Sequence, residues 1–296
     1  MSISAVERRN WTNQGAQDAA QRTYSSVKAA LDRSPALSRL DWEAFLQGSY
    51  ANHTNTRGDS DVDVVVMLKS SFTPDTRRLP PADQVRYEQH RVAATVTSDD
   101  FRGLVHQALD DYYGSQRVQP KDKCLRVDKA PGYVDADVVP ALQHRLYNSY
   151  PQFGQASWIE GIAIHPLSGG RIVNFPKQHR LNGEAKNGRC SSRYKPTVRQ
   201  IKRLRRRAVD LGLISKDIAP GYLIECLVYN VPDNLFGYDD SARMSTVLKW
   251  LHALTPEDLR TQCKSCDEVH HLFIDDPGDH DEYSTERMLD ALWKLL

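Results

Sequence analysis

Three aspartates in two apolar segments are the residues of this chain best suited to chemistry on phosphates. Asp61 and Asp63 open the segment DVDVVVML, and Asp137 lies within YVDADVVPAL. Side chains alternate along a strand, so Asp61 and Asp63 would share one face, and a neighbouring strand could place Asp137 beside them. Carboxylate oxygens suit magnesium, and several that converge can hold two ions about 4 Å apart. The pattern predicts a two-metal site, with magnesium or, as a substitute, manganese.

A Gly-Ser pair precedes the first two aspartates. Gly48 and Ser49 follow a predicted strand over residues 41–46, at a turn where glycine permits close backbone approach and exposed N–H groups with a hydroxyl can bind phosphate oxygens. A DxD pattern alone is usually an exposed strand edge, and a Gly-Ser pair alone means little. The combination, joined by a polar run to Ser60, is much rarer. We therefore favour a triphosphate site over an exposed edge.

The remaining pattern predicts a mixed architecture. Helical spacing indicates a long N-terminal helix over residues 14–33 and another helix near 99–113, whereas strands are expected from Asp61, at 125–127 and at 133–139. The Val-rich strand after Asp63 is typical of a strand buried on both faces. Residues 70–98 are expected to form a surface excursion. Beyond Pro176 we expect a polar loop to about Arg193, followed by helices to the end.

The composition limits the classes of partner. The 296 residues include 39 basic and 38 acidic ones, for a net charge of +1, so no global field favours a polyanion such as DNA. No apolar stretch approaches the roughly 20 residues that span a bilayer, and the start lacks the apolar core of a signal peptide, so a cytoplasmic protein is expected. The five cysteines, an odd number, are expected to be reduced.

A predicted helix over residues 196–212 carries two distinct stripes. One is basic and the other apolar; they comprise Lys195, Arg199, Lys202 and Arg206, and Val198, Ile201, Leu204, Ala208 and Leu211. The basic stripe could present cations to a phosphate chain or could be a solvated face. Spacing alone leaves these two interpretations open.

A second cluster contains possible metal ligands. Cys263, Cys266, His270 and His271 form a CxxC pattern followed by histidines. Zinc sites usually pair CxxC with more distant ligands, and all four residues could lie on one short helix. We favour a partly buried helix face over a zinc site. His179 and the other lone histidines are expected to be structural.

Taken together, these segments resemble a known family. QGSYANHTNTRGDSDVDVVVML looks like the signature of the bacterial cGAS/DncV-like nucleotidyltransferases, or CD-NTases, and the resemblance continues through VDADVVPAL, NFPKQHRLNGEAKN, YKPTVRQIKRLRR and PGYLIECLVYNVP. It is closest to the E clade, several members of which accept pyrimidine nucleotides. The resemblance implies an α+β fold: a polymerase-beta-like core over residues 1–180, a C-terminal helical domain over 181–296, and an active site in the cleft of a bilobed molecule.

The resemblance also implies roles for individual residues. Asp61, Asp63 and Asp137 match the metal-binding carboxylates, with Asp137 the best candidate to take the proton from the attacking ribose hydroxyl. The remaining matches are to nucleotide-binding positions: Gly48 and Ser49 to the phosphate turn, Lys202 to a lysine that reaches the triphosphate, Tyr222 to an aromatic that stacks on the base, and Asn174 to a residue facing the base. One departure is Gly221, where the family often has a serine.

The expected activity is synthesis of a cyclic oligonucleotide, most simply a cyclic dinucleotide, from ATP, UTP or other nucleoside triphosphates, with release of pyrophosphate. No template nucleic acid and no membrane is required, and the product would act on a downstream cyclic-nucleotide-responsive effector in antiphage defence. A nucleotidyltransferase that modifies an RNA end, a protein or a small molecule would share the same motifs. A catalytically idle nucleotide-binding protein is a third hypothesis, and the complete set of carboxylates argues against it.

Overall fold

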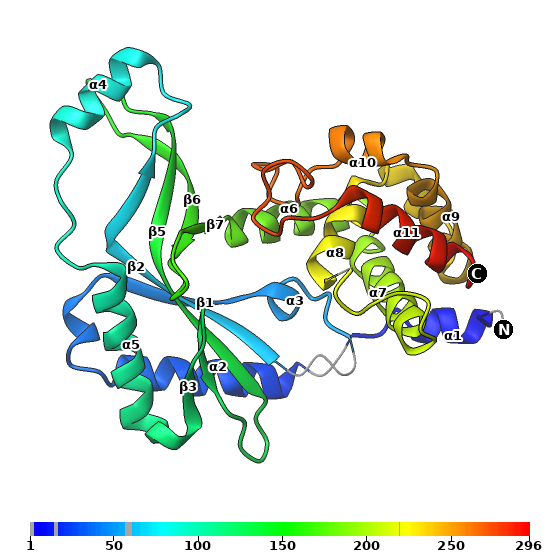
Figure 1. Ribbon diagram of the computed structural model, residues 1–296, viewed down its shortest axis with the longest axis horizontal. Coiled ribbons are helices and arrows are strands. Elements are labelled where there is room, and N and C mark those ends of the chain that lie inside the picture. Colours follow the sequence, from blue (N-terminus) through cyan, green and yellow to red (C-terminus); the bar gives the residue numbers. More distant parts are fainter. Residues whose placement is uncertain (1–2, 15–16, 57–60, 219) are drawn as a thin grey trace. The chain divides into compact units, whose positions relative to one another are not determined.

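The computed structural model describes residues 3–14, 17–56, 61–218 and 220–296. The polar connection expected between Ser49 and Asp61 therefore lies partly outside the described residues. The chain divides into two compact units (Figure 1), which we call the sheet unit and the helical unit. The sheet unit comprises residues 17–47 and 60–177, and the helical unit comprises residues 1–16, 48–59 and 178–296. None of the helices described is long and apolar enough to cross a membrane.

A mixed sheet forms the centre of the sheet unit. β2 and β5 run parallel at its middle, and the other pairs of neighbouring strands are antiparallel. The path runs β1–β2–β5–β4–β3, and β6 joins the far part of β5 and pairs with β7. The strands are β1 (Trp42–Gln47), β2 (Asp61–Asp75), β3 (Val118–Pro120), β4 (Leu125–Val127), β5 (Asp135–Ser149), β6 (Ser157–Ile164) and β7 (Ile172–Asn174).

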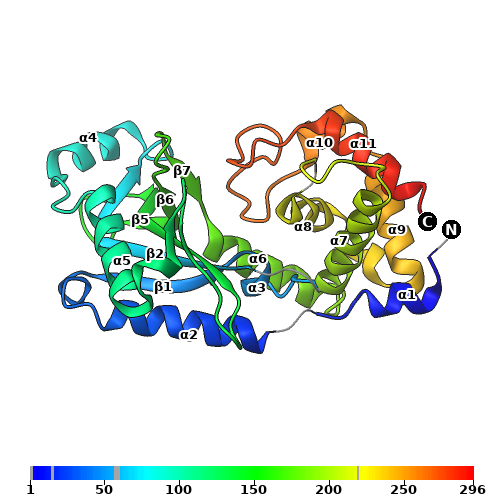
Figure 2. The same cartoon turned by 60° about the horizontal axis from the view of Figure 1, so that its bottom comes forward.

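Two helices cover one face of this sheet. α2 (Asp18–Asp32) and α5 (Ser98–Tyr113) lie side by side against it in Figures 1 and 2. The start of α5 is fixed by a capping box, in which the Thr97 hydroxyl accepts a hydrogen bond from the Asp100 N–H and the Asp100 carboxylate accepts one from the Thr97 N–H. The helices near 14–33 and 99–113 are thus confirmed.

The middle of β2 is buried on both of its faces, as its valine-rich sequence predicted. Val64 and Val66 point to one face and Val65 and Met67 to the other, and all four are fully buried. Val65 and Met67 pack in a cluster with Val139, Ala141, Ile162 and Ile164. Asp61 and Asp63 have the same parity as Val65, so they lie on the face of this cluster, toward its end.

The helical unit packs around its own apolar core. Its helices are α1 (Ala5–Asn10), α3 (Gly48–Ala51), α6 (Pro176–Arg189, of which the first two residues group with the sheet unit), α7 (Tyr194–Asp210), α8 (Gly221–Asn230), α9 (Asp240–His252), α10 (Pro256–Gln262) and α11 (Glu282–Trp293). The apolar stripe predicted on α7 is buried in this core at Val198, Ile201, Leu204 and Ala208, whereas Leu211 is exposed.

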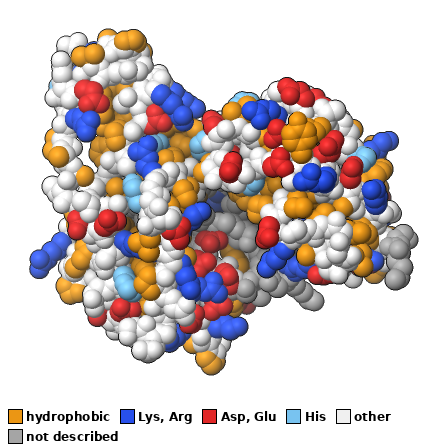
Figure 3. Space-filling view, viewed as in Figure 1, with side chains coloured by type: hydrophobic (Ala, Val, Ile, Leu, Met, Phe, Trp, Pro, Cys, Tyr) orange, Lys and Arg blue, Asp and Glu red, His pale blue; other side chains and the backbone are white. Residues whose placement is uncertain are grey.

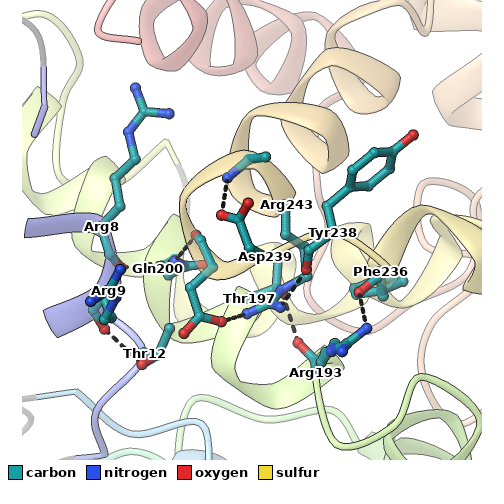
Figure 4. Close-up of polar contacts among 12 residues, drawn as sticks. Arg8, Arg9, Thr12, Arg193, Thr197, Gln200, Phe236, Tyr238, Asp239 and Arg243 are labelled. Carbon is teal, nitrogen blue, oxygen red and sulfur yellow. Dashed lines mark hydrogen bonds and ion pairs between the residues drawn. The ribbon is translucent and has the colours of Figure 1, made fainter. Parts of the chain in front are cut away.

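Buried polar side chains tie α7 to its neighbours (Figure 4). The Arg243 guanidinium of α9 is only 2% exposed, and it donates to the Thr197 hydroxyl of α7 at 2.9 Å and to the Tyr238 carbonyl at 3.0 Å. Gln200 of α7 donates to the Arg8 carbonyl of α1 at 2.8 Å. A buried arginine is tolerated only when its donors are satisfied, so these contacts fix α1, α7 and α9 as one assembly.

One sequence-based expectation was wrong. The expected polar loop from Pro176 to Arg193 is mostly the helix α6. Two of its polar residues, His179 and Lys186, are buried with partners: the Lys186 ammonium donates to the Val231 carbonyl and the Asp233 carboxylate, both at 2.7 Å. The segment over residues 70–98 lies largely at the surface, as expected, and it contains the end of β2 and α4 (Pro81–His90).

Gly161 allows β6 to approach the end of β7. A Cβ atom at this position would lie 2.8 Å from the Asn174 carbonyl oxygen and 2.9 Å from the Phe175 ring. These distances are shorter than any normal contact, so the backbone and the buried Phe175 ring would have to move.

We predict that Gly161→Ala lowers the free energy of unfolding by about 1–3 kcal/mol, the usual cost of overpacking. Gly103→Ala is the matched control, because nothing lies within 4 Å of the new Cβ on α5. It should be neutral or stabilising by about 0.5–1 kcal/mol. Urea unfolding of both variants measures the difference, and equal effects of the two substitutions would contradict the packing argument.

Candidate active site

The predicted carboxylates lie in register on the two parallel strands. Asp63 of β2 pairs with Asp137 of β5, and Asp61 pairs with Asp135. Paired residues of parallel strands point to the same face, so all four carboxylates project from one face of the sheet. The structure therefore brings Asp61, Asp63 and Asp137 together, and it adds Asp135.

An arginine that the sequence analysis overlooked lies among these carboxylates. Arg126 pairs with Asp137 across β4 and β5. Its Nη1 lies 2.9 Å from Asp61 Oδ2 and 3.2 Å from Asp137 Oδ1, and its Nη2 lies 3.0 Å from Asp135 Oδ2. Three carboxylates thus converge on one guanidinium. A basic residue between two apolar ones in LRV, beside acid-bearing strands, was the signal available in the sequence.

The charge balance of the cluster shows in the pKa of Asp63. Burial, together with the negative charges of Asp137 and Asp61, raises the pKa of Asp63 to about 7. The Cys124 thiol is affected in the same sense: burial and the charge of Asp137, to which it is hydrogen-bonded, raise its pKa to about 12. In both groups burial is the main cause, and the neighbouring carboxylates add to it.

These residues fit a divalent cation. The donors are hard carboxylate oxygens, which magnesium prefers, and two of them already converge on a single cationic nitrogen. A cation bound beside Asp63 would offset the repulsion from Asp137 and Asp61 that adds to the effect of burial on its pKa. An open pocket of ≈ 490 Å³ adjoins the cluster and is lined by Gln119, Lys121, Asp122, Lys123, Cys124, Arg126, Asp128 and Asp137.

The Gly-Ser pair begins a short helix, not an open turn. β1 ends at Gln47, which pairs with Asp63, and α3 begins at the next residue. Gly48 has a φ of 70°, in the left-handed region that favours glycine. The Asn52 N–H bonds the Gly48 carbonyl at 3.1 Å, and the Thr54 N–H bonds the Ser49 carbonyl at 2.9 Å. The backbone after Ser49 is thereby folded back onto the pair.

The basic stripe of α7 holds the segment that follows Ser49. Arg199 donates to the His53 carbonyl at 2.5 Å, Lys202 to the Thr54 hydroxyl at 3.1 Å, and Arg206 to the Thr56 hydroxyl at 3.1 Å. The interpretation of this stripe as a solvated face is therefore wrong. The structure places the predicted phosphate-binding residues Gly48, Ser49 and Lys202 around one segment of the helical unit.

A buried glutamate organises this region and was not foreseen. Glu225 of α8 accepts hydrogen bonds from the Thr54 hydroxyl at 2.7 Å and pairs with His179 Nε2 at 3.0 Å and with Lys202 Nζ at 3.4 Å. Burial alone would raise the pKa of Glu225, but the Lys202 charge and the hydrogen bonds from His179 and Thr54 lower it to about 2. Its sequence signal was a single acid within the apolar run LIECLVY.

Tyr222 lies close to two other aromatic rings of the helical unit. Its ring centroid is 5.6 Å from that of His179 and 5.8 Å from that of His280, and its hydroxyl donates to Asp276 at 2.7 Å. Gly221, the departure from the family pattern, lies against Lys202: a Cβ there would be 3.3 Å from Lys202 Cε. A serine at this position would require the Lys202 side chain to shift by a few tenths of an ångström.

Asn174 is the last residue of β7 in the sheet unit, paired with Ile162 of β6. It is half-buried, and its position is set by the close approach of β6 at Gly161. Asn174 therefore belongs to the sheet unit, like the carboxylates. The other predicted nucleotide-binding residues belong to the helical unit: Gly48, Ser49, Lys202 and Tyr222.

The CxxC segment does not form the expected helix. α10 ends at Gln262, and Cys263 is its C-terminal cap. Backbone hydrogen bonds between Cys263 and Leu272 and between Ser265 and His270 fold the following residues into a loop. His270 Nδ1 lies 2.9 Å from Asp267 and does not group with Cys263 and Cys266. The expectation of one helix face was wrong because these local contacts end the helix.

Charges on the visible face of each unit are mixed. Figure 3 shows acidic and basic side chains interspersed over both units on that face. This distribution agrees with the net charge of +1.

Comparisons with known proteins agree with this geometry. Residues 28–99 match the nucleotidyltransferase domain, and residues 181–296 match the cGAS/DncV-like nucleotidyltransferase C-terminal helical domain. The chain is 38% identical to the cyclic UMP-AMP synthase of Rhodothermus marinus, over 99% of this chain and 98% of that protein. It is 40% identical to a cyclic dipyrimidine nucleotide synthase of Legionella pneumophila, over 74% and 73% of the two chains.

A solved structure extends the likeness to three dimensions. The Rhodothermus marinus CdnE c-UMP-AMP synthase, determined with Apcpp and Upnpp, superposes with a TM-score of 0.86 at 36% identity, covering 99% of this chain and 96% of that one. The mixed sheet and the C-terminal helices are thus those of a known enzyme fold.

The low pKa of Glu225 predicts how pH affects stability. Because the folded-state pKa lies below the ordinary 4.5, the stabilisation from Glu225 is fully present above about pH 4.5 and is lost as the pH falls toward 2. We predict that Glu225→Gln costs about 3 kcal/mol at neutral pH, since Lys202 loses its buried partner. The cost should shrink below pH 4.5.

Urea unfolding at neutral pH and at several lower values measures this change. Glu257→Gln, at an exposed residue in the first turn of α10, is the control and should have a small effect throughout. A penalty for Glu225→Gln that stays constant with pH would show that the glutamate is not stabilised as an anion.

Proposed function

This chain belongs to the cGAS/DncV-like nucleotidyltransferases of the CdnE clade, which make cyclic dinucleotides from nucleoside triphosphates, and from that premise we propose how its own residues carry out the reaction. The observation that carries the proposal is the register of β2 and β5, which aligns Asp63 with Asp137 and Asp61 with Asp135. This alignment assembles the acidic cluster from residues that are far apart in the sequence.

Asp61, Asp63 and Asp137 are proposed to hold two magnesium ions. Bound there, the ions would neutralise charge on the phosphates and make the attacking ribose hydroxyl more acidic. The hydroxyl oxygen forms a bond to the α-phosphorus, the bond from that phosphorus to the bridging oxygen breaks, and pyrophosphate leaves. The Asp137 carboxylate takes the hydroxyl proton. One set of carboxylates serves both bond-forming steps, and the linear intermediate turns over between them.

The helical unit is proposed to bind the nucleotide. The Gly48 and Ser49 N–H groups and the Ser49 hydroxyl contact the phosphate oxygens, and Lys202 supplies a positive charge to the triphosphate. The contact of Lys202 with Thr54 supports this role, because Thr54 bonds back to Ser49. Tyr222 provides an aromatic surface for the base.

We further propose that one of the bases is a pyrimidine. Two of the similar proteins are a cyclic UMP-AMP synthase and a cyclic dipyrimidine nucleotide synthase. Asn174 is half-buried at the end of β7, and its amide can both donate to and accept from a base edge. The product would act as a second messenger on a downstream effector in antiphage defence.

An incubation with labelled nucleoside triphosphates and magnesium tests the activity. A phosphatase-resistant small nucleotide, formed without any acceptor and identified by mass spectrometry, is the expected product. Incubations that omit one triphosphate at a time identify the bases, and product formed without UTP and CTP would overturn the pyrimidine proposal. Label found only on added RNA or protein would favour transfer to another acceptor.

We predict that Asp61→Asn with Asp63→Asn lowers product formation by at least 10²–10³-fold, roughly the cost of removing one electrostatic contact to the developing charge. The fold should remain, because uncharged amides relieve the repulsion in the cluster. Asp99→Asn, on the exposed first turn of α5, is the control and should keep full activity. Full turnover by the double variant would refute the assignment.

Arg126 is proposed to act as a counter-ion that competes with the metal. Its guanidinium contacts Asp61 and Asp137, two of the three proposed metal ligands, and also Asp135. A cation entering between these carboxylates must replace some of these contacts. Arg126 therefore stabilises the cluster before the metal binds, and it sets the magnesium concentration that synthesis requires.

We predict that Arg126→Gln lowers the half-saturating magnesium concentration several-fold to about tenfold, a factor of ten being about 1.4 kcal/mol. In the presence of a chelator, the same variant should lose about 1–3 kcal/mol of stability, because charged hydrogen bonds are removed. Arg126→Lys keeps the positive charge but lacks the planar guanidinium. Its half-saturating magnesium concentration should lie between those of the wild type and of Arg126→Gln. Initial rates against magnesium measure the effect, and an unchanged or higher requirement in Arg126→Gln would contradict the competition.

A further inference from the structure

Three soft metal ligands meet inside the helical unit, apart from the carboxylates of the sheet unit. They are His179 of α6, Cys226 of α8 and Cys266 of the loop after α10. One ligand atom from each lies within 4.8 Å of the other two. His179 is 6% exposed and both cysteines are 0% exposed. These three side chains are therefore close enough to one another to surround a single ion.

We propose that His179, Cys226 and Cys266 bind a zinc ion. One imidazole and two thiolates form a donor set that zinc accepts with three protein ligands and a fourth position left for a small molecule. Thiolate and imidazole ligands favour zinc over the magnesium that carboxylates prefer. Two thiolates and a neutral imidazole balance the charge of Zn²⁺, so the bound ion adds no net charge to a buried place.

The surroundings of the three ligands match those of a metal site. Ligating histidines almost always donate the N–H of the second ring nitrogen to a carboxylate, a carbonyl or a water, which fixes the orientation of the ring. Glu225 provides this carboxylate, at 3.0 Å from His179 Nε2. The Cys226 sulfur accepts from the Cys266 N–H at 3.4 Å, and the Tyr194 hydroxyl lies 3.7 Å from the Cys266 sulfur.

The loop that carries Cys266 is also tied to the helices that carry the other ligands. Asn182 of α6 donates to the Cys266 carbonyl at 2.9 Å, and Asn230 of α8 donates to the Lys264 carbonyl at 2.8 Å. The backbone around Cys266 is therefore held in place independently of the thiol. Such a pre-formed arrangement lowers the entropy cost of closing a metal site from three separate segments.

Zinc at this place would stiffen the surroundings of Tyr222. Cys226 is one helical turn beyond Tyr222 on α8, and the His179 ring lies against the Tyr222 ring. The Tyr222 hydroxyl bonds Asp276 in the same loop that carries Cys266. The ion would thus link the three segments around the proposed base-stacking residue. This consequence rests on the proposed function, whereas the zinc site itself does not.

Metal analysis of the full-length protein tests the site directly. Protein expressed with added zinc and dialysed against metal-free buffer should retain about one zinc per chain, a stoichiometry read by elemental mass spectrometry. Replacement of zinc by cobalt(II) should give the intense thiolate charge-transfer absorption of a cobalt–cysteine complex. Neither readout depends on nucleotide turnover, so failure of the zinc site would be distinguishable from failure of the proposed function.

Matched cysteine variants locate the ion. Cys226→Ser and Cys266→Ser should weaken zinc binding at least tenfold, whereas Cys263→Ser and Cys190→Ser, at buried cysteines outside the cluster, should retain it. Unchanged zinc content in the first pair, or equal loss in the second, would overturn the proposal. Wild-type protein that retains no zinc and contains a Cys226–Cys266 disulfide would also overturn it and would identify the pair as redox-active instead.

Discussion

The structure depends on the parallel pairing of β2 with β5, which places like charges in register. Asp61 faces Asp135 and Asp63 faces Asp137, an arrangement that is unfavourable by itself because opposed carboxylates repel. The valines that follow Asp63 and Asp137 hold both strands in the core, where Val64 and Val138 pair with each other and are fully buried. Burial in the sheet thus holds together an acidic cluster whose own electrostatics would separate it, and the Arg126 guanidinium offsets part of the repulsion.

A comparable buried charge organises the helical unit. Glu225 has almost no contact with solvent, and it remains ionised because Lys202, His179 and Thr54 all point toward it. Through Thr54 it fixes the backbone just after Ser49, and Arg199 and Arg206 hold the same segment on either side. The basic side chains of α7 therefore have a structural function before any phosphate is bound. A phosphate ligand would contact side chains that also hold the segment after Ser49 in place.

The two units carry different classes of metal-binding side chain, hard in the sheet unit and soft in the helical unit. The carboxylates of β2 and β5 suit magnesium and similar ions, whereas the imidazole and thiols around His179 suit zinc. Glu225 links the second group to the segment after Ser49, because it bonds both His179 and Thr54. Local changes near the thiols would consequently be felt at the proposed nucleotide-binding residues through one buried side chain.

The sequence by itself determined the strands that carry Asp61, Asp63 and Asp137, the helices α2, α5 and α7, and the family, because apolar periodicity and a spaced motif are local properties of the chain. It failed for α6, where the polar residues His179 and Lys186 are buried with partners from other segments, and for the segment after Cys263, where backbone contacts end the helix. Only the tertiary structure decided three sets of contacts: those of Arg126 with the carboxylates, those of Glu225 with its partners, and the approach of His179 to Cys226 and Cys266. Each depends on residues from distant segments, and a single sequence carries no record of which segments will meet.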